Sequence, residues 1–473
     1  MKEYKLLLNN NWQEGNKIRK IKSPYNNKEI AQVHFADECQ MTSAVFAAHK
    51  AYEKTHKLSC HERSTVLEKI SNTIERRLEE LAESIALCAG KTIKSSRVEV
   101  SRAVNTFKIA SEEAKRMNGE IISLDLSPQT KGRWGLVRRF PIGVVAGITP
   151  FNFPLNLVAH KVAPSIASGN TIILRPASQV AMTSLILGEI IKATEFPPGG
   201  VNVIPSSYKA ADVLIDDERV KKITFTGSPA IGWELKKRAY KKRITLELGG
   251  NAAVVIEPDA DLKYALDRTV LGSFSYSGQV CIAIQRVYLH EKIYDKFLSD
   301  FVTEAKKLKM GDPLSEETDI GPMINEEAAK QIEEWVNEAV EQKASLLCGG
   351  TRNGSMYPPT ILENVDPHLR VSWLEAFAPV AVVYRYSDFQ AALNSVNDSI
   401  YGLQAGVFTN DLKKAFQAYE TLDVGGVILN DIPTFRIDHM PYGGVKESGF
   451  GREGLKYAID EMTELKLMAL NLL

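Results

Sequence analysis

The chain has 473 residues, too many for one ordinary core, so we expect two or three domains. Lysine plus arginine and aspartate plus glutamate both number 58, and zero net charge argues against nucleic acid or a membrane surface as partner. Hydrophobic residues make up 44% and charged residues 25%, as in globular proteins, and we find no stretch long enough to cross a bilayer.

The first 141 residues predict three successive structures. Residues 1 to about 35 alternate in short apolar and polar runs with turn signals, and residues 38 to 118 are helical in pattern. In that second region apolar residues recur at three- and four-residue steps, for example Val66, Ile70 and Ile74. The polar segment 120–141 then predicts a hairpin that leaves the body of the protein.

From residue 142 onward, short apolar runs alternate with helical patterns, which predicts a parallel, doubly wound sheet. Strands are expected at 142–146, 171–174, 201–204 and 222–225, with helices at 155–168, at 179–194, after 204 and from near 228. A second alternating series from 252 to about 428 predicts a second α/β domain. Residues 463–473 predict one further strand.

The five cysteines are scattered without the spacing of a disulfide framework, which indicates a reducing compartment and favours a cytoplasmic location. One glycine pattern is misleading. GFGREG at 449–454 fits the dinucleotide-binding fingerprint, but no strand precedes it and only 19 residues follow, too few for a βαβ unit. A role in a turn or loop is expected there.

Two other loops are better candidates for binding a nucleotide. In TFTGSPAIG (224–232) a strand ends, Gly227 permits the turn, Ser228 occupies a helix N-cap and Pro229 the first helical position. Free N–H groups at such a helix start favour a phosphate. In LRPAS (174–178), Arg175 stands where a strand ends and could meet a ribose or phosphate. Each motif alone also fits an ordinary turn or an exposed arginine.

Three residues suggest chemistry. Cys281 closes FSYSGQVC (274–281), where a thiol after a flexible Ser-Gly pair could attack a carbonyl once it loses its proton. Asn152, in a loop between two prolines, could donate to an oxyanion. Glu247, within the apolar run LELGG (246–250), needs a partner or a raised pKa, which suits a general base. Taken singly, each could instead be structural.

Together these motifs resemble the aldehyde dehydrogenase superfamily over essentially the whole chain. The matching segments follow in family order: TPFNFP (149–154), LRPAS, TFTGSPAIG, LELGG, FSYSGQVC, EAFAP (375–379) and MPYGGVKESG (440–449). The resemblance implies an α/β fold with a Rossmann-type NAD(P)-binding domain (1–119 and 142–247) and a second α/β catalytic domain (248–445). It also implies an oligomerisation ribbon with a C-terminal strand (120–141 and 446–473), and hence a homodimer or homotetramer.

The resemblance assigns roles to individual residues. Cys281 would be the nucleophile, Asn152 with the Cys281 backbone N–H the oxyanion hole, and Glu247 the base that activates water, with Lys161 near the catalytic asparagine. NAD or NADP would be held by Thr149, Pro150, Phe151, Arg175, Ser178, Gly227, Ser228, Gly249, Glu375 and Phe377. The substrate would meet Arg102, Phe153, Val280, Ile282 and His439. No metal is implied.

The implied reaction is oxidation of an aldehyde to the acid through a thiohemiacetal and a thioester on Cys281. Arg175 replaces the usual family lysine, and Ser178 stands where NAD-preferring members often carry glutamate, so dual or NADP-leaning use is predicted. Val280 and the segment 436–442 resemble lactaldehyde- and glycolaldehyde-type relatives, so short polar aldehydes are expected. A semialdehyde or a phosphorylated aldehyde, a CoA-acylating enzyme and a non-catalytic binding protein remain alternatives.

Overall fold

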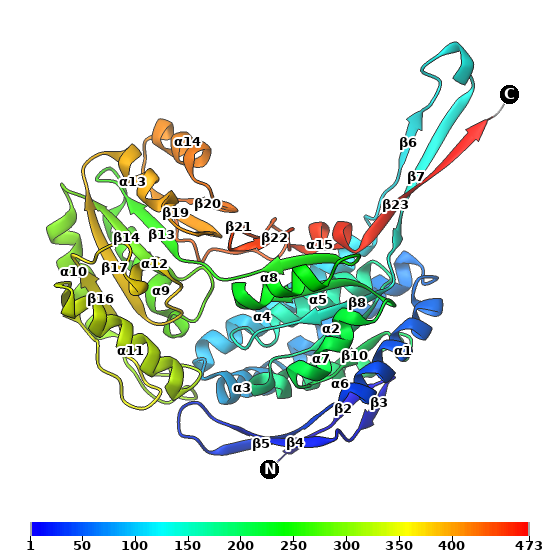
Figure 1. Ribbon diagram of the computed structural model, residues 1–473, viewed down its shortest axis with the longest axis horizontal. Coiled ribbons are helices and arrows are strands. Elements are labelled where there is room, and N and C mark those ends of the chain that lie inside the picture. The colour runs from blue at the N-terminus through cyan, green and yellow to red at the C-terminus, as the bar shows by residue number, and fades with distance from the viewer. Residues whose placement is uncertain (1, 472–473) are drawn as a thin grey trace.

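The protein, seen here as a computed structural model that describes residues 2–471, consists of two α/β domains and a projecting arm (Figure 1). The first domain is built on an eight-stranded sheet with the order β22-β12-β11-β8-β9-β10-β2-β3. Its strands are β2 (Leu6–Leu8), β3 (Asn11–Gln13), β8 (Val144–Ile148), β9 (Thr171–Arg175), β10 (Val201–Val203), β11 (Val220–Thr226), β12 (Arg243–Glu247) and β22 (Gly449–Phe450).

The centre of this sheet is parallel from β12 to β10, as the alternating pattern predicted. The chain adds β9 and β10 on one side of β8 and then β11 and β12 on the other. The strand order therefore reverses between β8 and β11, the point where doubly wound sheets bind their ligands. The loops at 149–154 and 227–228 leave the sheet at that point.

Helices cover both faces of the sheet because successive strand residues are apolar and point to opposite sides. Val145 belongs to one core, and Val144 and Ala146 belong to the other. The first core is closed by α2 (Cys60–Arg76), α3 (Leu78–Ala89), α4 (Ile93–Ala114), α5 (Asn156–Ala167) and α6 (Ala181–Lys192). The second is closed by α1 (Glu38–Thr55), α7 (Tyr208–Asp216) and α8 (Pro229–Arg238).

The predicted helical region 38–118 therefore forms the four helices α1 to α4. The amphipathic stretch in it is α2, which begins at a capping box of Ser59 and Glu62 and buries Val66, Ile70 and Ile74. Beside these helices, β1 (Lys2–Tyr4), β4 (Lys17–Lys22) and β5 (Glu29–Phe35) form a small sheet that includes the N-terminal segment.

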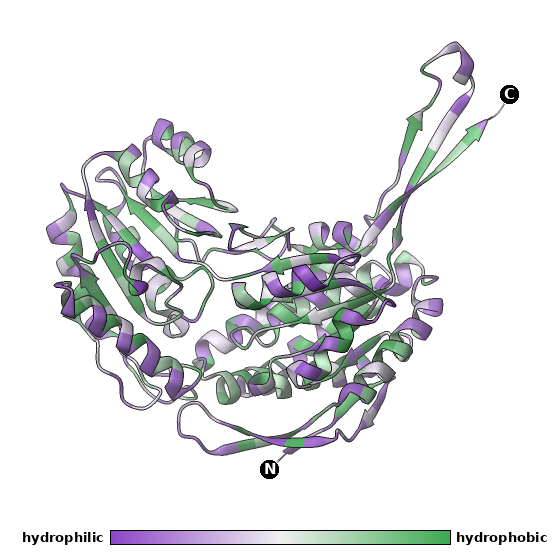
Figure 2. Cartoon of the chain, viewed as in Figure 1, coloured by the Kyte–Doolittle hydropathy of each residue, from purple (hydrophilic) through white to green (hydrophobic). Residues whose placement is uncertain are grey.

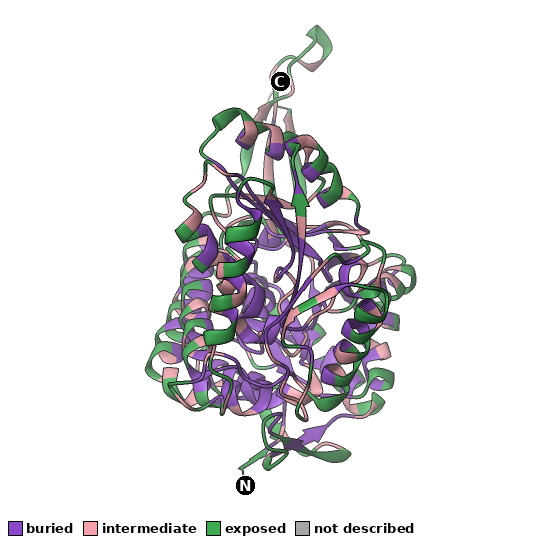
Figure 3. Ribbon diagram, turned by 90° about the vertical axis from the view of Figure 1, so that its left-hand side faces the viewer, coloured by how far each residue is buried: buried purple, intermediate pink, exposed green. Residues whose placement is uncertain are grey.

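The second domain contains a seven-stranded sheet whose inner strands are mostly buried between outer helices, while the two edge strands are partly exposed (Figure 3). In sheet order the strands are β15 (Ser345–Cys348), β16 (Thr360–Glu363), β17 (Val380–Tyr386), β14 (Ile284–His290), β13 (Ala252–Ile256), β19 (Gln404–Phe408) and β20 (Gly426–Leu429). Helices α9 (Leu262–Phe274) and α10 (Tyr294–Lys307) cover one face. The other face is covered by α11 (Glu326–Glu341), α12 (Arg370–Trp373), α13 (Phe389–Asn397) and α14 (Leu412–Thr421).

The arm is an antiparallel ribbon of β6 (Glu120–Ser123), β7 (Arg133–Pro141) and β23 (Thr463–Asn471), and it stands away from both domains (Figure 1). Its strands carry hydrophobic residues along their length (Figure 2). Among these, Ile121, Leu465 and Leu467 are more than half exposed. Residues 472 and 473, which the sequence also assigned to the last strand, lie outside the described residues.

Only part of the C-terminal segment 446–473 belongs to this ribbon. The short strand β21 (Val445–Lys446) pairs with β18 (Tyr401–Gly402), β22 pairs with β12, and α15 (Leu455–Glu461) packs against α4 and α5 of the first domain. The glycine pattern at 449–454 thus forms an edge strand and a loop, although it does follow the two-residue strand β21. Gly449 is required there because a Cβ would strike the Leu246 carbonyl oxygen.

Candidate active site

A cleft of about 910 Å³ lies at the strand-order reversal of the first sheet. It is lined by the loops that follow β8, β9, β11 and β12, and by segments of the second domain that precede β14 and β17. Twelve of the predicted site residues line it together: Thr149, Pro150, Phe151, Asn152, Arg175, Gly227, Ser228, Glu247, Gly249, Cys281, Glu375 and Phe377. Ser178 lies outside this lining, in the short helix at 178–180.

The N-terminus of α8 has the features of an anion-binding site. Ser228 is the N-cap residue, with φ −70° and ψ 146°, and Pro229 occupies the first turn, as predicted. Within residues 2–471 the Ser228 side chain makes no capping hydrogen bond, and Ser228, Ala230 and Ile231 line the cleft at the end of the helix where the first N–H groups have no intrahelical partner. A phosphate group fits such a site.

The loop that carries Cys281 is held in an uncommon backbone conformation. Tyr276 and Ser277 have φ values of 50° and 53°, in the left-handed region that non-glycine residues rarely adopt. Gly278 follows at φ 65°, and a Cβ there would strike the Ala378 carbonyl. On the other side, a Cβ on Gly250 would strike the carbonyl oxygen of Cys281. The backbone from Gly278 to Cys281 is thus held between two segments that approach it closely.

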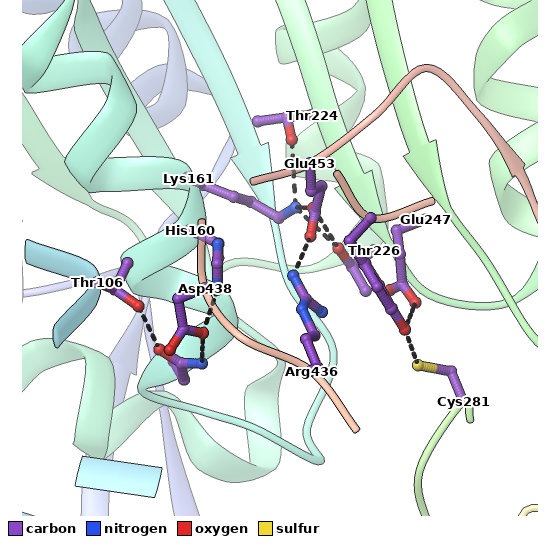
Figure 4. A network of polar contacts seen from close by, with 12 residues as sticks. Thr106, His160, Lys161, Thr224, Thr226, Glu247, Cys281, Arg436, Asp438 and Glu453 are labelled. Atoms are coloured by element: carbon purple, nitrogen blue, oxygen red, sulfur yellow. Dashed lines mark hydrogen bonds and ion pairs between the residues drawn. The ribbon is translucent and has the colours of Figure 1, made fainter. Parts of the chain in front are cut away.

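The Cys281 thiol is surrounded by polar groups of the catalytic set. Its Sγ lies 3.1 Å from the hydroxyl of Tyr442, and that hydroxyl lies 3.3 Å from Oε1 of Glu247 (Figure 4 shows the cysteine and the glutamate). Burial, and then the neighbouring Glu247 carboxylate, raise the pKa of the Cys281 thiol well above its usual value. The resting sulfur therefore keeps its proton and needs a base.

Glu247 is suited to be that base. It is the last residue of β12 and is buried, with 1% exposure. Burial, followed by the charge of Glu453, raises the pKa of Glu247 to about 7. A carboxylate with this pKa can take up and release a proton near neutral pH.

Asn152 points its amide at the backbone that leads to the thiol. Nδ2 donates to the carbonyl oxygen of Gln279 at 3.0 Å, and the side chain is buried. An amide nitrogen carries two protons, so one remains for an aldehyde oxygen beside Cys281. Its Oδ1 has no hydrogen-bond partner among residues 2–471.

Lys161 lies outside the cleft, fully buried in α5, in a charged network behind Glu247 (Figure 4). Its Nζ lies 3.0 Å from Oε1 of Glu453 and 2.8 Å from the Thr226 hydroxyl. The other oxygen of Glu453 lies 3.1 Å from the guanidinium of Arg436. Both cations help to lower the pKa of Glu453 to about 2 against the effect of its burial, so this carboxylate stays charged.

A second buried group adjoins this network through the segment 436–438. Oδ1 of Asp438 meets the guanidinium of Arg102 at 2.7 Å and Nε2 of His160 at 2.9 Å. The side-chain amide of Asn156 also donates to Oδ1 of Asp438, at 3.1 Å. The pair with Asp438 places the predicted substrate residue Arg102 next to the segment 436–438, which includes Arg436. Predicted His439 is exposed, and no hydrogen bond of its side chain is found within residues 2–471.

A small group of apolar residues packs around Cys281. Ile282 packs with Leu403 and Tyr442, and Val280 and Cys281 lie against this group. Phe153, the remaining predicted substrate residue, lies with its ring centroid 6.3 Å from that of Tyr276. Cys281 therefore has apolar neighbours on this side in addition to the polar contact with Tyr442.

Glu375 and Phe377 bring the second domain to the cleft. Oε1 of Glu375 accepts the N–H of Gly250 at 2.9 Å, and burial raises the pKa of Glu375 to about 8. Phe377 has φ 46° and packs edge-on to Phe151, with ring centroids 5.8 Å apart. Gly249 lets the Glu375 carboxylate lie close to the backbone, since a Cβ there would make that side chain shift. Such strain commonly marks a ligand site.

Sequence reasoning missed Tyr442, Arg436, Glu453, Asp438 and His160. The first four lie in the segment 436–453, which was interpreted as a family motif and a glycine-rich loop, without a role for these side chains. A signal was present, since Arg, Asp, Tyr and Glu recur there among glycines at 443, 444, 449, 451 and 454. Charged residues so close together in a segment that must approach other backbone indicate burial with partners.

Fold and site together define a dehydrogenase of the kind that combines a cysteine nucleophile with a dinucleotide cleft. Comparison with known proteins agrees. The aldehyde dehydrogenase family matches residues 12–468. A 3-sulfolactaldehyde dehydrogenase of Priestia aryabhattai is 41% identical over 100% of this chain and 99% of its own. A lactaldehyde dehydrogenase of Methanococcus aeolicus is 39% identical over 98% of this chain and 100% of its own.

A solved structure is also very similar. Aldehyde dehydrogenase 21 of Physcomitrella patens, in complex with the reaction product succinate, superposes with a TM-score of 0.98 and 46% identity, covering 99% of this chain and 98% of that one. The chain belongs to the aldehyde dehydrogenase family. It is an NAD(P)-dependent enzyme that oxidises an aldehyde, which confirms the predicted class over a non-catalytic protein. Among residues 2–471, no helix is both long and apolar enough to cross a membrane.

Proposed function

We propose that this enzyme oxidises short aldehydes whose far end is hydroxylated or anionic. The observation that carries the proposal is the positive charge of Arg436 near the thiol, since its guanidinium lies 3.6 Å from the ring centroid of Tyr442, whose hydroxyl meets Sγ of Cys281. Arg102 adds a second cation at Asp438, two residues along the same segment. The relatives named for lactaldehyde and sulfolactaldehyde, and the one bound to succinate, act on or bind compounds of this size and polarity.

Of the two arginines, Arg102 is the one whose side chain remains accessible, with 25% exposure, while Arg436 is buried at 7%. A polar or anionic substrate group can therefore pair with the Arg102 guanidinium beside Asp438, and it meets the charge of Arg436 at longer range. Long aliphatic aldehydes offer no such group.

In the proposed reaction, the Cys281 sulfur attacks the aldehyde carbon and Asn152 with the Cys281 N–H stabilises the oxyanion. The cleft fits a dinucleotide, with its phosphates at Ser228 and its nicotinamide end near Glu375 and Phe377. Bound NAD(P)⁺ would accept the hydride. Glu247 then activates the water that hydrolyses the Cys281 thioester. Because Glu247 would activate water, we expect the product to be the free acid and not an acyl-CoA. Acid formation that is unchanged when CoA is added would support this.

A substrate panel tests the proposal. Lactaldehyde, glycolaldehyde, succinate semialdehyde, glyceraldehyde 3-phosphate and hexanal are compared by kcat/KM, and hexanal ranking first would refute it. Because a hydrogen bond to a charged group contributes about 1.5–3 kcal/mol, Arg102→Met should lower kcat/KM for succinate semialdehyde about 10- to 100-fold. Arg97→Met is the matched control on the same helix, since within residues 2–471 Arg97 pairs with the outer residues Glu79 and Glu316 alone.

For the cofactor we propose dual use with a preference for NADP⁺. The support is Arg175, whose guanidinium lies 4.7 Å from the Tyr208 ring centroid and whose Nε is buried without a partner in residues 2–471. The carboxylate of Asp212 also lines the cleft but is paired with Arg238 at 2.7 Å. An NAD⁺ kcat/KM about 100-fold above that for NADP⁺, or about 2.7 kcal/mol, would reject this preference.

We also propose that the arm joins copies into a homodimer or homotetramer. The exposed apolar residues of β6 and β23 support this, because an isolated ribbon gains little by exposing them. Light scattering coupled to size-exclusion chromatography should show two or four copies, and a monomer would contradict it. The five free cysteines support a reducing, cytoplasmic location.

A further inference from the structure

The hydroxyl of Tyr442 bridges the nucleophile and the base. It lies 3.1 Å from Sγ of Cys281 and 3.3 Å from Oε1 of Glu247, and it can accept from one and donate to the other. Tyr442 and Glu247 are each only 1% exposed, so water has little access to the space between them. The reaction in this family requires the sulfur to lose a proton in this place.

The ring that carries this hydroxyl is fixed on all sides. The guanidinium of Arg436 lies 3.6 Å from the ring centroid, and Ile282 and Leu403 pack against the ring. The Tyr442 backbone exchanges two hydrogen bonds with Glu453, of 3.1 and 2.6 Å. A side chain held this firmly keeps its hydroxyl in register with the sulfur without losing further conformational entropy during the reaction.

We propose that Tyr442 is a catalytic residue that relays the thiol proton of Cys281 to Glu247. The S–H proton passes to the Tyr442 oxygen as the phenolic proton passes to Oε1 of Glu247. One S–H and one O–H bond break while two O–H bonds form, which leaves a thiolate, a neutral tyrosine and a neutral glutamic acid. The Tyr442 O–H then donates to the thiolate. The relay rests on the proposed nucleophilic role of Cys281.

The electrostatics around the three groups favour this transfer. Burial and the charge of Glu453 raise the pKa of Glu247 to about 7, so its carboxylate can accept a proton near neutral pH. The positive charge of Arg436 lowers the pKa of the thiol, of the phenol and of Glu247, and at the sulfur it favours the thiolate. Glu453 forms ion pairs with both Arg436 and Lys161.

Alkylation of Cys281 by iodoacetamide tests the relay because only the thiolate reacts. Rates are followed for this one cysteine by peptide mass spectrometry from about pH 5.5 to 9.5, since exposed Cys39 and Cys60 also react. Tyr442→Phe keeps the ring under Arg436 and removes the hydroxyl alone. We expect alkylation near pH 7 to slow about tenfold or more, with the pH profile displaced upward. Tyr386→Phe, a remote variant that also removes a buried, hydrogen-bonded hydroxyl, should leave the profile unchanged.

The double variant Tyr442→Phe with Glu247→Gln separates a relay from a packing role. In a relay the two residues act in series, so the double variant should react no more slowly than Glu247→Gln alone. Effects that multiply, or a Tyr442→Phe profile that overlays the wild type, would overturn the proposal. If Tyr442→Phe fails to bind NADP⁺, fluorotyrosine at position 442 keeps the shape and lowers the phenol pKa, and an unshifted profile would overturn it. Dehydrogenase activity retained by Cys281→Ser would instead refute the nucleophile itself.

Discussion

Replacing Asn152 with alanine should damage catalysis far more than stability. In the proposed reaction its buried amide is the side-chain donor to an oxyanion beside Cys281, and loss of one such donor reduces kcat about 10²- to 10³-fold, or about 2.7–4 kcal/mol. The same change strips the Gln279 carbonyl of its Asn152 donor, which should lower the free energy of unfolding by about 1–3 kcal/mol.

The assay compares kcat/KM with the urea midpoint of unfolding, and Asn202→Ala is the control. Asn202 is also buried in the first domain, donates to the Gly199 carbonyl at 2.8 Å and accepts from the Asn9 N–H at 2.8 Å. It should lose comparable stability while keeping its kcat/KM. A fall of less than about tenfold for Asn152→Ala, or an equal kinetic loss for Asn202→Ala, would refute the oxyanion role.

Two further predictions concern the base and the nucleophile's backbone. Because the raised pKa of Glu247 is about 7, its ionised form accumulates above that pH, so kcat limited by thioester hydrolysis should rise between about pH 6 and 8. A flat kcat profile over this range would contradict the assignment. Gly250→Ala places a Cβ against the Cys281 carbonyl and should lower kcat/KM about 10²-fold, as expected when a reacting group moves by about 1 Å. Gly311→Ala, whose Cβ would meet only the Thr318 hydroxyl at 3.0 Å, should retain activity, and equal activity of the two variants would contradict the geometric argument.

The sequence was sufficient for the residues whose chemistry depends on local structure. Ser228 is at the start of α8 because a strand, a glycine and a proline surround it, and Asn152 follows β8 for a similar reason. Glu247 was expected inside a strand and proves to be its last residue, which is what lets the carboxylate reach the cleft.

The site residues that the sequence did not reveal depend on contacts between distant segments. Tyr442 reaches Cys281 across 161 residues, and Lys161 reaches Glu453 across 292. Periodicity does not encode such pairings, because β22 and α15 return to the first domain through a segment with little repeating pattern. For the same reason the residues 446–461 were assigned with the ribbon although they pack beside the strand β12, which carries Glu247, and the helices α4 and α5.

The central claim is that the aldehyde carbon becomes bonded to the sulfur of Cys281. Mass spectrometry of the Glu247→Gln variant, mixed with lactaldehyde and NADP⁺ and quenched in acid, tests it most directly, because slowed hydrolysis should let the thioester accumulate. We predict a lactoyl adduct on the peptide that contains Cys281. An enzyme that turns over without any adduct there, or with the adduct on Cys39, Cys60, Cys88 or Cys348, would contradict this account.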